Sequence, residues 1–172
     1  AFGALALAVI CAVVSLSSGV VAAGPVQPVL RTPLLPLHVI TIILSYVFIG
    51  LLAVNALVSL VVYWFNGNYT RLENTAISGR VMLYYATWLL VAGIFLFAAW
   101  ANIAWGRYWG WDPKEVWALI TLLVCSVGFH TRSLPFMARP LVFHIFCLVA
   151  FLAMLFTFFG VNYLLGGLHS YA

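Results

Sequence analysis

The chain has 172 residues, of which 66% are hydrophobic and only 6% are charged, and its formal net charge is +4. A soluble domain needs far more charged surface than this, so the composition excludes a soluble protein and indicates a polytopic membrane protein. The few basic residues are spread along the chain, which excludes a nucleic-acid-binding protein. The apolar runs are unbroken for about 20 residues or more. We therefore predict an all-α bundle of five transmembrane helices, not a β-barrel.

The first predicted membrane helix covers residues 2–23, and a linker follows at residues 24–36. The linker cannot form a regular helix because prolines recur along it, at Pro25, Pro28, Pro33 and Pro36. We treat residues 1–36 as one segment and residues 37–172 as the main membrane domain. The chain begins with alanine instead of methionine, so we expect it to be a fragment or a processed chain.

Two further apolar runs predict a second helix at residues 37–65 and a third at residues 80–104. Residues 66–79 between them are polar and begin with turn-forming residues, so we predict a loop there. A mildly polar stripe, His38, Thr41 and Ser45, lies on one face of the second helix. Such a stripe is also typical of packing between membrane helices.

Residues 105–115 read W-G-R-Y-W-G-W-D-P-K-E and hold three of the seven tryptophans, two of the three acids and two of the seven Lys or Arg residues. This concentration of rings and charges fits a surface for a flat, apolar and partly charged molecule such as a porphyrin. The alternative is an ordinary interfacial tryptophan belt. We favour the belt for Trp88, Trp100 and Trp117 and a binding role for the dense set Trp105, Trp109 and Trp111.

A fourth helix is predicted at residues 113–131, because Asp112 is a good N-cap and Pro113 suits the first helical position. A basic turn follows at residues 132–140, then a fifth helix at residues 141–165 and a tail. The small residues Thr121, Cys125 and Gly128 indicate close helix contact.

Alternation of the helices places the linker, the aromatic block and the tail on one face of the membrane. The loop at residues 66–79 and the turn at residues 132–139 then share the other face. The seven basic residues divide three to four between these faces, so the positive-inside rule favours the second face as cytoplasmic only weakly. The three cysteines, Cys11, Cys125 and Cys147, lie in apolar runs without a C-x-x-C motif. We predict that they are buried and supply no thiol chemistry.

His38 and His169 fall on the face of the aromatic block, and two imidazoles can bind haem iron from opposite sides of a porphyrin. Arg107 and Lys114 are the nearest cations for its propionates, although Asp112 could instead pair with Lys114 and fix the loop.

The other two histidines lie toward the opposite face. His130 is predicted to end the fourth helix, about 22 Å from Glu115. Polar groups inside membrane helices are often functional. No motif supports His144 as a ligand.

The run W-A-N-I-A-W-G-R-Y-W-G-W-D-P-K-E-V-W-A-L-I-T-L-L, residues 100–123, closely resembles the tryptophan-rich WWD signature of haem-handling cytochrome c assembly proteins. With G-G-L-H-S-Y near the end, it is similar to the CcsA/ResC branch of the System II cytochrome c synthase. The related CcmC and CcmF proteins share the loop but usually diverge after W-D. The resemblance covers most of the chain from His38 onward.

This resemblance implies a membrane synthase that moves haem outward and joins it to apocytochrome c. By position, His38 and His169 match the two external haem ligands, and His130 matches the ligand of an inner haem site. The second inner ligand would belong to a CcsB/ResB-like membrane subunit or to a fused half. The implied location is a bacterial plasma membrane or a thylakoid, with the outer haem site on the extracytoplasmic side.

We therefore predict a holocytochrome c synthase (haem lyase) that presents haem b, iron protoporphyrin IX, to the C-x-x-C-H motif of apocytochrome c. The two cysteine thiols of that motif add to the haem vinyl groups, so positioning is the main contribution of the protein and no nucleophile of its own is needed. Thioredoxin-like thiol reductants are expected as indirect partners, and membrane lipid surrounds the helices. The candidate haem-binding residues are His38, His169, His130, Trp105, Trp109, Trp111, Asp112, Arg107 and Lys114, the three histidines being the iron ligands.

Two alternatives remain open at this point. The first is a haem exporter or a protein that loads a haem chaperone, without ligase activity. The second is a transporter or structural subunit that has a tryptophan belt and binds no haem.

Overall fold

The computed structural model describes residues 32–165. These residues belong to the second of two units into which the chain divides, Ala1–Arg31 and Thr32–Ala172. All regular structure in the described part is helical, which confirms the predicted all-α membrane fold. The predicted first helix, most of the linker, Cys11 and the tail with His169 lie outside the described residues.

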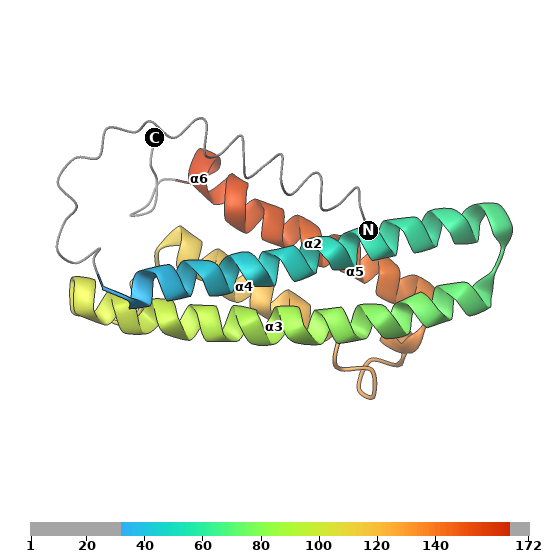
Figure 1. Ribbon diagram of the computed structural model, residues 1–172, viewed down its shortest axis with the longest axis horizontal. Coiled ribbons are helices and arrows are strands. Elements are labelled where there is room, and N and C mark those ends of the chain that lie inside the picture. The colour runs from blue at the N-terminus through green and yellow to red at the C-terminus, as the bar shows by residue number, and fades with distance from the viewer. Residues whose placement is uncertain (1–31, 166–172) are drawn as a thin grey trace. The chain divides into compact units, whose positions relative to one another are not determined.

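Two long antiparallel helices, α2 (Leu34–Asn66) and α3 (Tyr69–Trp105), pack side by side (Figure 1). With 33 and 37 residues, they are about 50 and 55 Å long. Both exceed the ~30 Å hydrocarbon core of a bilayer, so each extends well beyond it. The turn between them is short because Gly67 adopts a left-handed conformation (φ 63°) and Asn68 caps α3 by accepting a hydrogen bond from the Arg71 amide at 3.0 Å.

The predicted loop at residues 66–79 is therefore wrong, because residues 69–79 form the first three turns of α3. Polar side chains suggested a loop, but this segment also carries Leu72, Ala76 and Gly79 at the three-to-four-residue spacing of a helix face. All three are buried against neighbouring helices. A carbon atom added at Gly79 would lie only 2.9 Å from the Phe143 ring, so the helices approach closely there.

The remaining helices are shorter and cover this pair. Helix α4 (Pro113–Val127) leads through a turn with the 3-10 helix η2 (Pro135–Ala138) to α5 (Pro140–Leu155). Helix α5 continues through a π-helical turn, η3 (Phe156–Gly160), into α6 (Val161–Leu164).

Helices α2 and α3 and the run Pro140–Leu164 are long and apolar enough to cross a membrane. Helix α4 has 15 residues and is about 22 Å long. It ends four residues before the predicted boundary, because the Phe129 and His130 amides donate to carbonyls only three residues back and tighten the chain into a turn. His130 therefore lies after the helix and not at its end.

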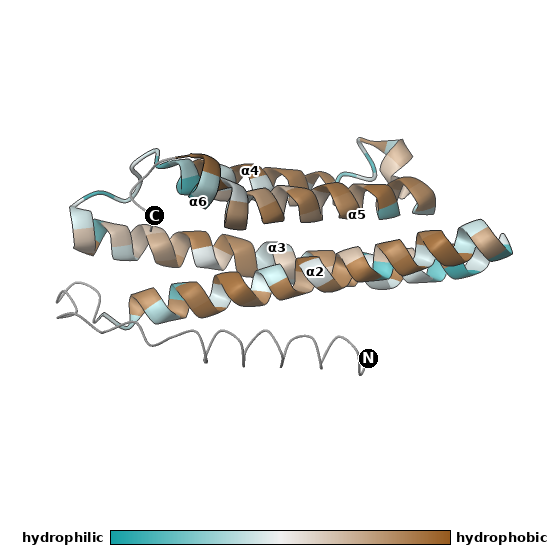
Figure 2. Ribbon diagram, turned by 90° about the horizontal axis from the view of Figure 1, so that it is seen from above, coloured by the Kyte–Doolittle hydropathy of each residue, from teal (hydrophilic) through white to brown (hydrophobic). Residues whose placement is uncertain are grey.

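A shared core joins α2, α3, α4 and α5, with Leu52, Leu83, Cys125, Phe143 and Cys147 buried at its centre. Cys125 and Cys147 are buried, as predicted. Around the core, the outward faces of the helices are apolar, and polar residues gather toward helix ends and connections (Figure 2). This distribution suits helices surrounded by lipid.

Some polar side chains in the helices make contacts between helices. Ser45 donates to the Ala86 carbonyl at 2.8 Å, and the Thr121 and Thr157 hydroxyls lie 2.7 Å apart. A carbon atom added at Gly128 would lie 2.5 Å from a Leu83 methyl group. These contacts agree with helix packing as the role of Ser45 and of the stripe Thr121, Cys125 and Gly128.

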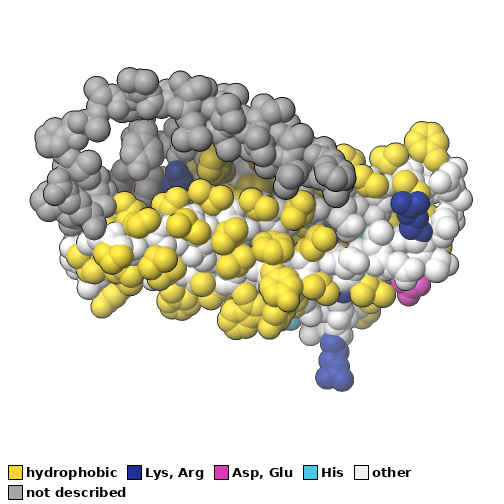
Figure 3. Space-filling view, in the orientation of Figure 1, with side chains coloured by type: hydrophobic (Ala, Val, Ile, Leu, Met, Phe, Trp, Pro, Cys, Tyr) yellow, Lys and Arg dark blue, Asp and Glu magenta, His cyan; other side chains and the backbone are white. Residues whose placement is uncertain are grey.

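The described part has two distinct ends. One end carries the start of α2, the end of α3, the start of α4 and α6. The other carries the α2–α3 turn and the segment between α4 and α5, and four arginines, Arg71, Arg80, Arg132 and Arg139, lie there. We call the first of these the aromatic end and the second, with the four arginines, the basic end. In Figure 3, dark-blue basic side chains project from the surface near both connections of the basic end.

Candidate functional site

The aromatic loop, residues 106–112, begins and ends on two local backbone signals. Gly106 ends α3 in a left-handed conformation with φ 69°. Asp112 starts α4 as its N-cap, and its carboxylate accepts a hydrogen bond from the Lys114 amide at 3.1 Å. With Pro113 next in the chain, this is the helix start that the sequence predicts. Asp112 is buried, so this contact gives it a structural role in the loop.

Glu115, in the first turn of α4, fastens the loop, although it was not among the predicted site residues. Its side chain is 4% exposed, and its Oε2 accepts hydrogen bonds from the Gly110 amide at 2.7 Å and the Asp112 amide at 3.2 Å. These two amides flank Trp111, which has the left-handed φ of 57° that a bulky residue rarely adopts. A buried carboxylate therefore holds the backbone on both sides of a strained tryptophan.

The tryptophans of the loop and of the adjoining end of α3 form two groups. Trp105 packs edge-on against Trp100, with ring centroids 5.0 Å apart, and lies 6.1 Å from the Phe97 ring. Trp109 and Trp111 form a perpendicular pair at 6.2 Å. The Trp111 ring is 75% exposed. The loop therefore presents indole surface outward, where it can contact another molecule.

His38 lies beside the first of these groups, the aromatic cluster of Phe97, Trp100 and Trp105. Its ring is 5.3 Å from the Phe97 ring, and its Nδ1 lies 2.9 Å from the Gly93 carbonyl of α3. Helices α2 and α3 approach closely here, since a carbon atom added at Gly93 would lie 2.5 Å from the Ile42 side chain. A carbonyl only accepts hydrogen bonds, so Nδ1 carries the proton. The lone pair of the neutral ring is then on Nε2, as in histidines oriented for metal binding.

The two predicted cations of the loop have different surroundings. The Arg107 side chain is exposed and folds over Gly110, since its guanidinium lies 3.1–3.2 Å from where a Cβ would stand. The Lys114 ammonium instead donates to Asn162 Oδ1 of α6 at 2.9 Å. Burial lowers the pKa of Lys114, and the nearby Asp112 carboxylate partly offsets this. Asn162 was missed from the sequence, where its signal is an amide near the end of an apolar helix.

The structure does not bring the other described histidines to the loop. His130 is exposed at the basic end. His144 is fully buried in α5, and its Nε2 lies 3.1 Å from the Leu72 carbonyl and 3.2 Å from the Thr75 hydroxyl. Its Nδ1 has no hydrogen-bond partner within residues 32–165. His144 therefore ties α5 to α3 at the basic end.

Histidine, cysteine, aspartate and glutamate are also the residues that could bind a bare metal ion. The described residues contain no group of three or more of them placed to do so.

Comparison with known proteins adds to this geometry. The sequence profile described as "Cytochrome C assembly protein" matches residues 1–169. The chain belongs to this family. It is 38% identical over 150 residues to protein NrfI of Wolinella succinogenes, which covers 84% of the chain and 17% of NrfI. It is 35% identical over 157 residues to the cytochrome c biogenesis protein CcsA of Chlamydomonas reinhardtii, covering 87% of the chain and 43% of CcsA.

A third relative is CcsA of Atropa belladonna, with 48% identity over 82 residues, or 48% of the chain and 26% of that protein. These matches confirm the resemblance to the CcsA branch, and a cytochrome c assembly protein has a role in cytochrome c maturation. The chain spans less than half the length of each of these relatives. The three long apolar helices agree with an integral membrane protein.

Proposed function

We propose that the aromatic end presents haem b for covalent attachment to apocytochrome c. The observation that carries this proposal is the setting of His38, whose protonated Nδ1 faces the Gly93 carbonyl while its ring packs beside the aromatic cluster. A ring held in this way has Nε2 as its only ligand atom, so its orientation and tautomer suit an axial contact to haem iron. Family membership makes haem the appropriate substrate.

The other roles follow from the surroundings of each residue. His169 is assigned as the second axial ligand, on the opposite side of the porphyrin from His38. Trp105, Trp109 and Trp111 cover the macrocycle with indole rings. Arg107 is the better propionate partner because its side chain is exposed, whereas the Lys114 ammonium is bound to Asn162. Asp112 acts through the loop backbone.

The chemistry needs no nucleophile from this chain. Each thiol of the apocytochrome C-x-x-C-H motif adds across a vinyl group, so sulfur bonds to the vinyl carbon beside the ring and the proton goes to the terminal carbon. The addition is redox-neutral, but it requires free thiols, which thioredoxin-like reductants would maintain. The chain contributes by holding the vinyl edge in position and excluding water.

The basic end is the place where haem is taken up, and His130 is a haem ligand there. Arg80 lies 25 residues before Trp105 on α3, so the two ends are about 37 Å apart along the helix. We place the aromatic end on the extracytoplasmic side. Because the chain covers a fraction of its relatives' length, a CcsB/ResB-like subunit or a fused half would complete the inner site.

The test replaces His38 by glycine, with and without added imidazole, and measures the Soret absorbance of the purified protein and the yield of a co-expressed cytochrome. We expect His38→Gly to lose the part of the Soret absorbance that comes from haem at the aromatic end, together with most of the cytochrome yield. Imidazole should restore part of each, because it can occupy the vacated axial position. Ser45→Ala, in the same stripe of α2, is the matched control and should retain both. Unchanged haem content in His38→Gly would refute the proposal.

A second reporter separates attachment from export. An apocytochrome with serines in place of its two motif cysteines should receive no covalent haem from the wild-type protein. Haem delivery that is equal for both reporters would instead indicate an exporter without ligase activity. A wild-type protein without a Soret band, purified from haem-replete cells, would indicate that no haem is bound.

A further inference from the structure

Two cavities at the basic end meet at Arg80. The first has a volume of about 310 Å³ and is lined by α3 and by the turn after α4, including Thr131 and Ala138. The second has a volume of about 320 Å³ and is lined by Arg80, Val81, Tyr84, Tyr85 and Phe129. Each is within the range of small-molecule sites, about 300 to 1,000 Å³. Arg80 is the residue that lines both.

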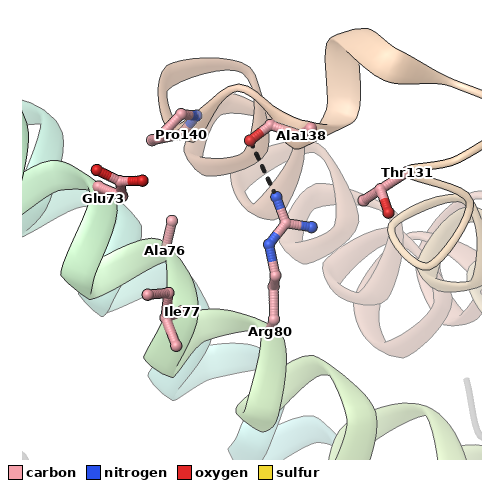
Figure 4. A pocket seen from close by; sticks show the side chains of 7 residues that line it. All are labelled: Glu73, Ala76, Ile77, Arg80, Thr131, Ala138 and Pro140. Atoms are coloured by element: carbon pink, nitrogen blue, oxygen red, sulfur yellow. Dashed lines mark hydrogen bonds between the residues drawn. The ribbon is translucent and has the colours of Figure 1, made fainter.

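Arg80 is held in place by its surroundings. Its Nη2 donates to the Met137 carbonyl at 2.8 Å and more weakly to the Ala138 carbonyl at 3.5 Å. Its guanidinium also lies over the Phe143 ring at 4.3 Å. Both hydrogen bonds to described residues use the same nitrogen, and Figure 4 shows the other terminal nitrogen directed toward Thr131 across the first cavity. A guanidinium fixed in this way can donate to a carboxylate without rearranging.

The second cavity supplies an aromatic wall. The Tyr84 ring packs edge-on against Tyr85 at 6.1 Å and Phe129 at 6.3 Å. All three rings lie on the surface, with exposures of 52% for Tyr84, 53% for Tyr85 and 41% for Phe129. A flat apolar molecule that reached this wall from the membrane would cover the exposed rings.

His130 lies in the chain between two residues that line the cavities. Its chain neighbours on either side, Phe129 and Thr131, each line one of them, and His130 itself is exposed. We propose that Arg80 and the Tyr84–Phe129 wall form a recognition site for a dicarboxylic porphyrin, with a propionate at Arg80 and the macrocycle against the rings. This rests on the proposed function, in which His130 is a haem ligand, and it names the residues that select the substrate at that end.

The local charges fit this ligand. The carboxylate of Glu73 also lines the first cavity, but it is seven residues from Arg80, about 10 Å along the helix, with Ala76 and Ile77 between them in Figure 4. A propionate at Arg80 therefore stays away from it. An anionic phospholipid could bind Arg80 and the apolar wall, but it carries no metal for the His130 imidazole to ligate.

The test compares haemin with haemin dimethyl ester, whose propionates are blocked, by spectroscopic titration of the detergent-solubilised chain. A His38→Ala background removes the outer site from the measurement. We expect Arg80→Gln to weaken haemin binding about tenfold, as expected for loss of one charge-assisted hydrogen bond, and to leave ester binding unchanged. Arg80→Lys should give an intermediate loss. Arg132→Gln is the matched control, with the same charge change outside both cavities, and should change neither affinity more than twofold.

Arg80 also anchors the turn through Met137, so a second variant guards against misfolding. Tyr84→Leu with Phe129→Leu keeps Arg80 and should weaken haemin and its ester equally. The inference is overturned if Arg80→Gln weakens both ligands equally, or neither, or if it removes only bound phosphatidylglycerol in native mass spectrometry. A wild-type chain that binds no haemin would overturn the proposed function as well, whereas wild-type binding without dependence on Arg80 overturns only this inference.

Discussion

Removing the Glu115 carboxylate should release the aromatic loop and leave the helical bundle folded. In Glu115→Ala, the Gly110 and Asp112 amides lose their common acceptor, Glu115 Oε2. The left-handed backbone of Trp111 between them then loses these two hydrogen bonds. The core is unaffected because none of its buried apolar residues lies in the loop.

The size of the effect follows from these two hydrogen bonds. Each hydrogen bond to a charged group contributes about 1.5–3 kcal/mol, but water can reach the half-buried Gly110 amide, so we expect a total of about 2–4 kcal/mol. At ~1.4 kcal/mol per factor of ten, amide exchange in the loop should accelerate about 30- to 1,000-fold. Glu115→Gln keeps one acceptor oxygen without the charge, and we expect roughly half the free-energy loss.

Hydrogen–deuterium exchange of peptides covering residues 106–116 measures this directly. Glu73→Ala is the control, since it removes an exposed carboxylate near the other end of α3, and it should change exchange in the loop by less than a factor of about two. Helical circular dichroism should stay the same in all three variants. Equal loop protection in Glu115→Ala and Glu73→Ala would refute the role assigned to the carboxylate.

Four further substitutions test packing and charge. Gly128→Ala should destabilise by about 1–3 kcal/mol, because its Cβ would lie 2.5 Å from Leu83. Gly50→Ala, with nothing within 4 Å, should stabilise by about 0.5–1 kcal/mol; equal melting temperatures would contradict this pair. Ser45→Ala should cost about 0.5–1.5 kcal/mol in denaturant unfolding through loss of its bond to the Ala86 carbonyl, and no shift in midpoint would argue against it. Burial lowers the pKa of Lys114 below its ordinary value of 10.5. Just below pH 10.5 the unfolded chain therefore binds more protons than the folded chain, and the contribution of this group to the free energy of unfolding rises with pH. Lys114→Met should remove that part of the pH dependence, which unfolding experiments at several pH values would measure.

The features that the sequence predicts well are local or periodic. The start of α4 was predictable because Asp112 and Pro113 act on backbone within a few residues of themselves. The membrane helices were predictable because apolar runs of sufficient length have few other structures open to them. The small-residue stripe ending at Gly128 indicated a close helix contact because small side chains on one helix face let a neighbouring helix approach.

The features that it does not predict depend on backbone conformation or on distant partners. Residues 69–79 read as a loop because polarity reports exposure, and an exposed helix face is as polar as a loop. Glu115 appeared only as one acid of a charged block, since its contacts require the left-handed turn at Trp111. The partnership of Lys114 with Asn162 joins residues 48 positions apart, and nothing in either segment specifies the other.

At Trp111, the stability of the fold and the exposure of an indole ring make opposite demands on one residue. Glycine would adopt the same φ at no cost, whereas a bulky side chain there costs about 1 kcal/mol or more. Selection of variants for heat resistance alone should therefore drift toward glycine at position 111 and discard the indole. Selection for a ring that projects from the membrane surface should keep the tryptophan and tolerate the weaker fold. Any stabilised form of this protein made for structural work would have to be checked at this position first.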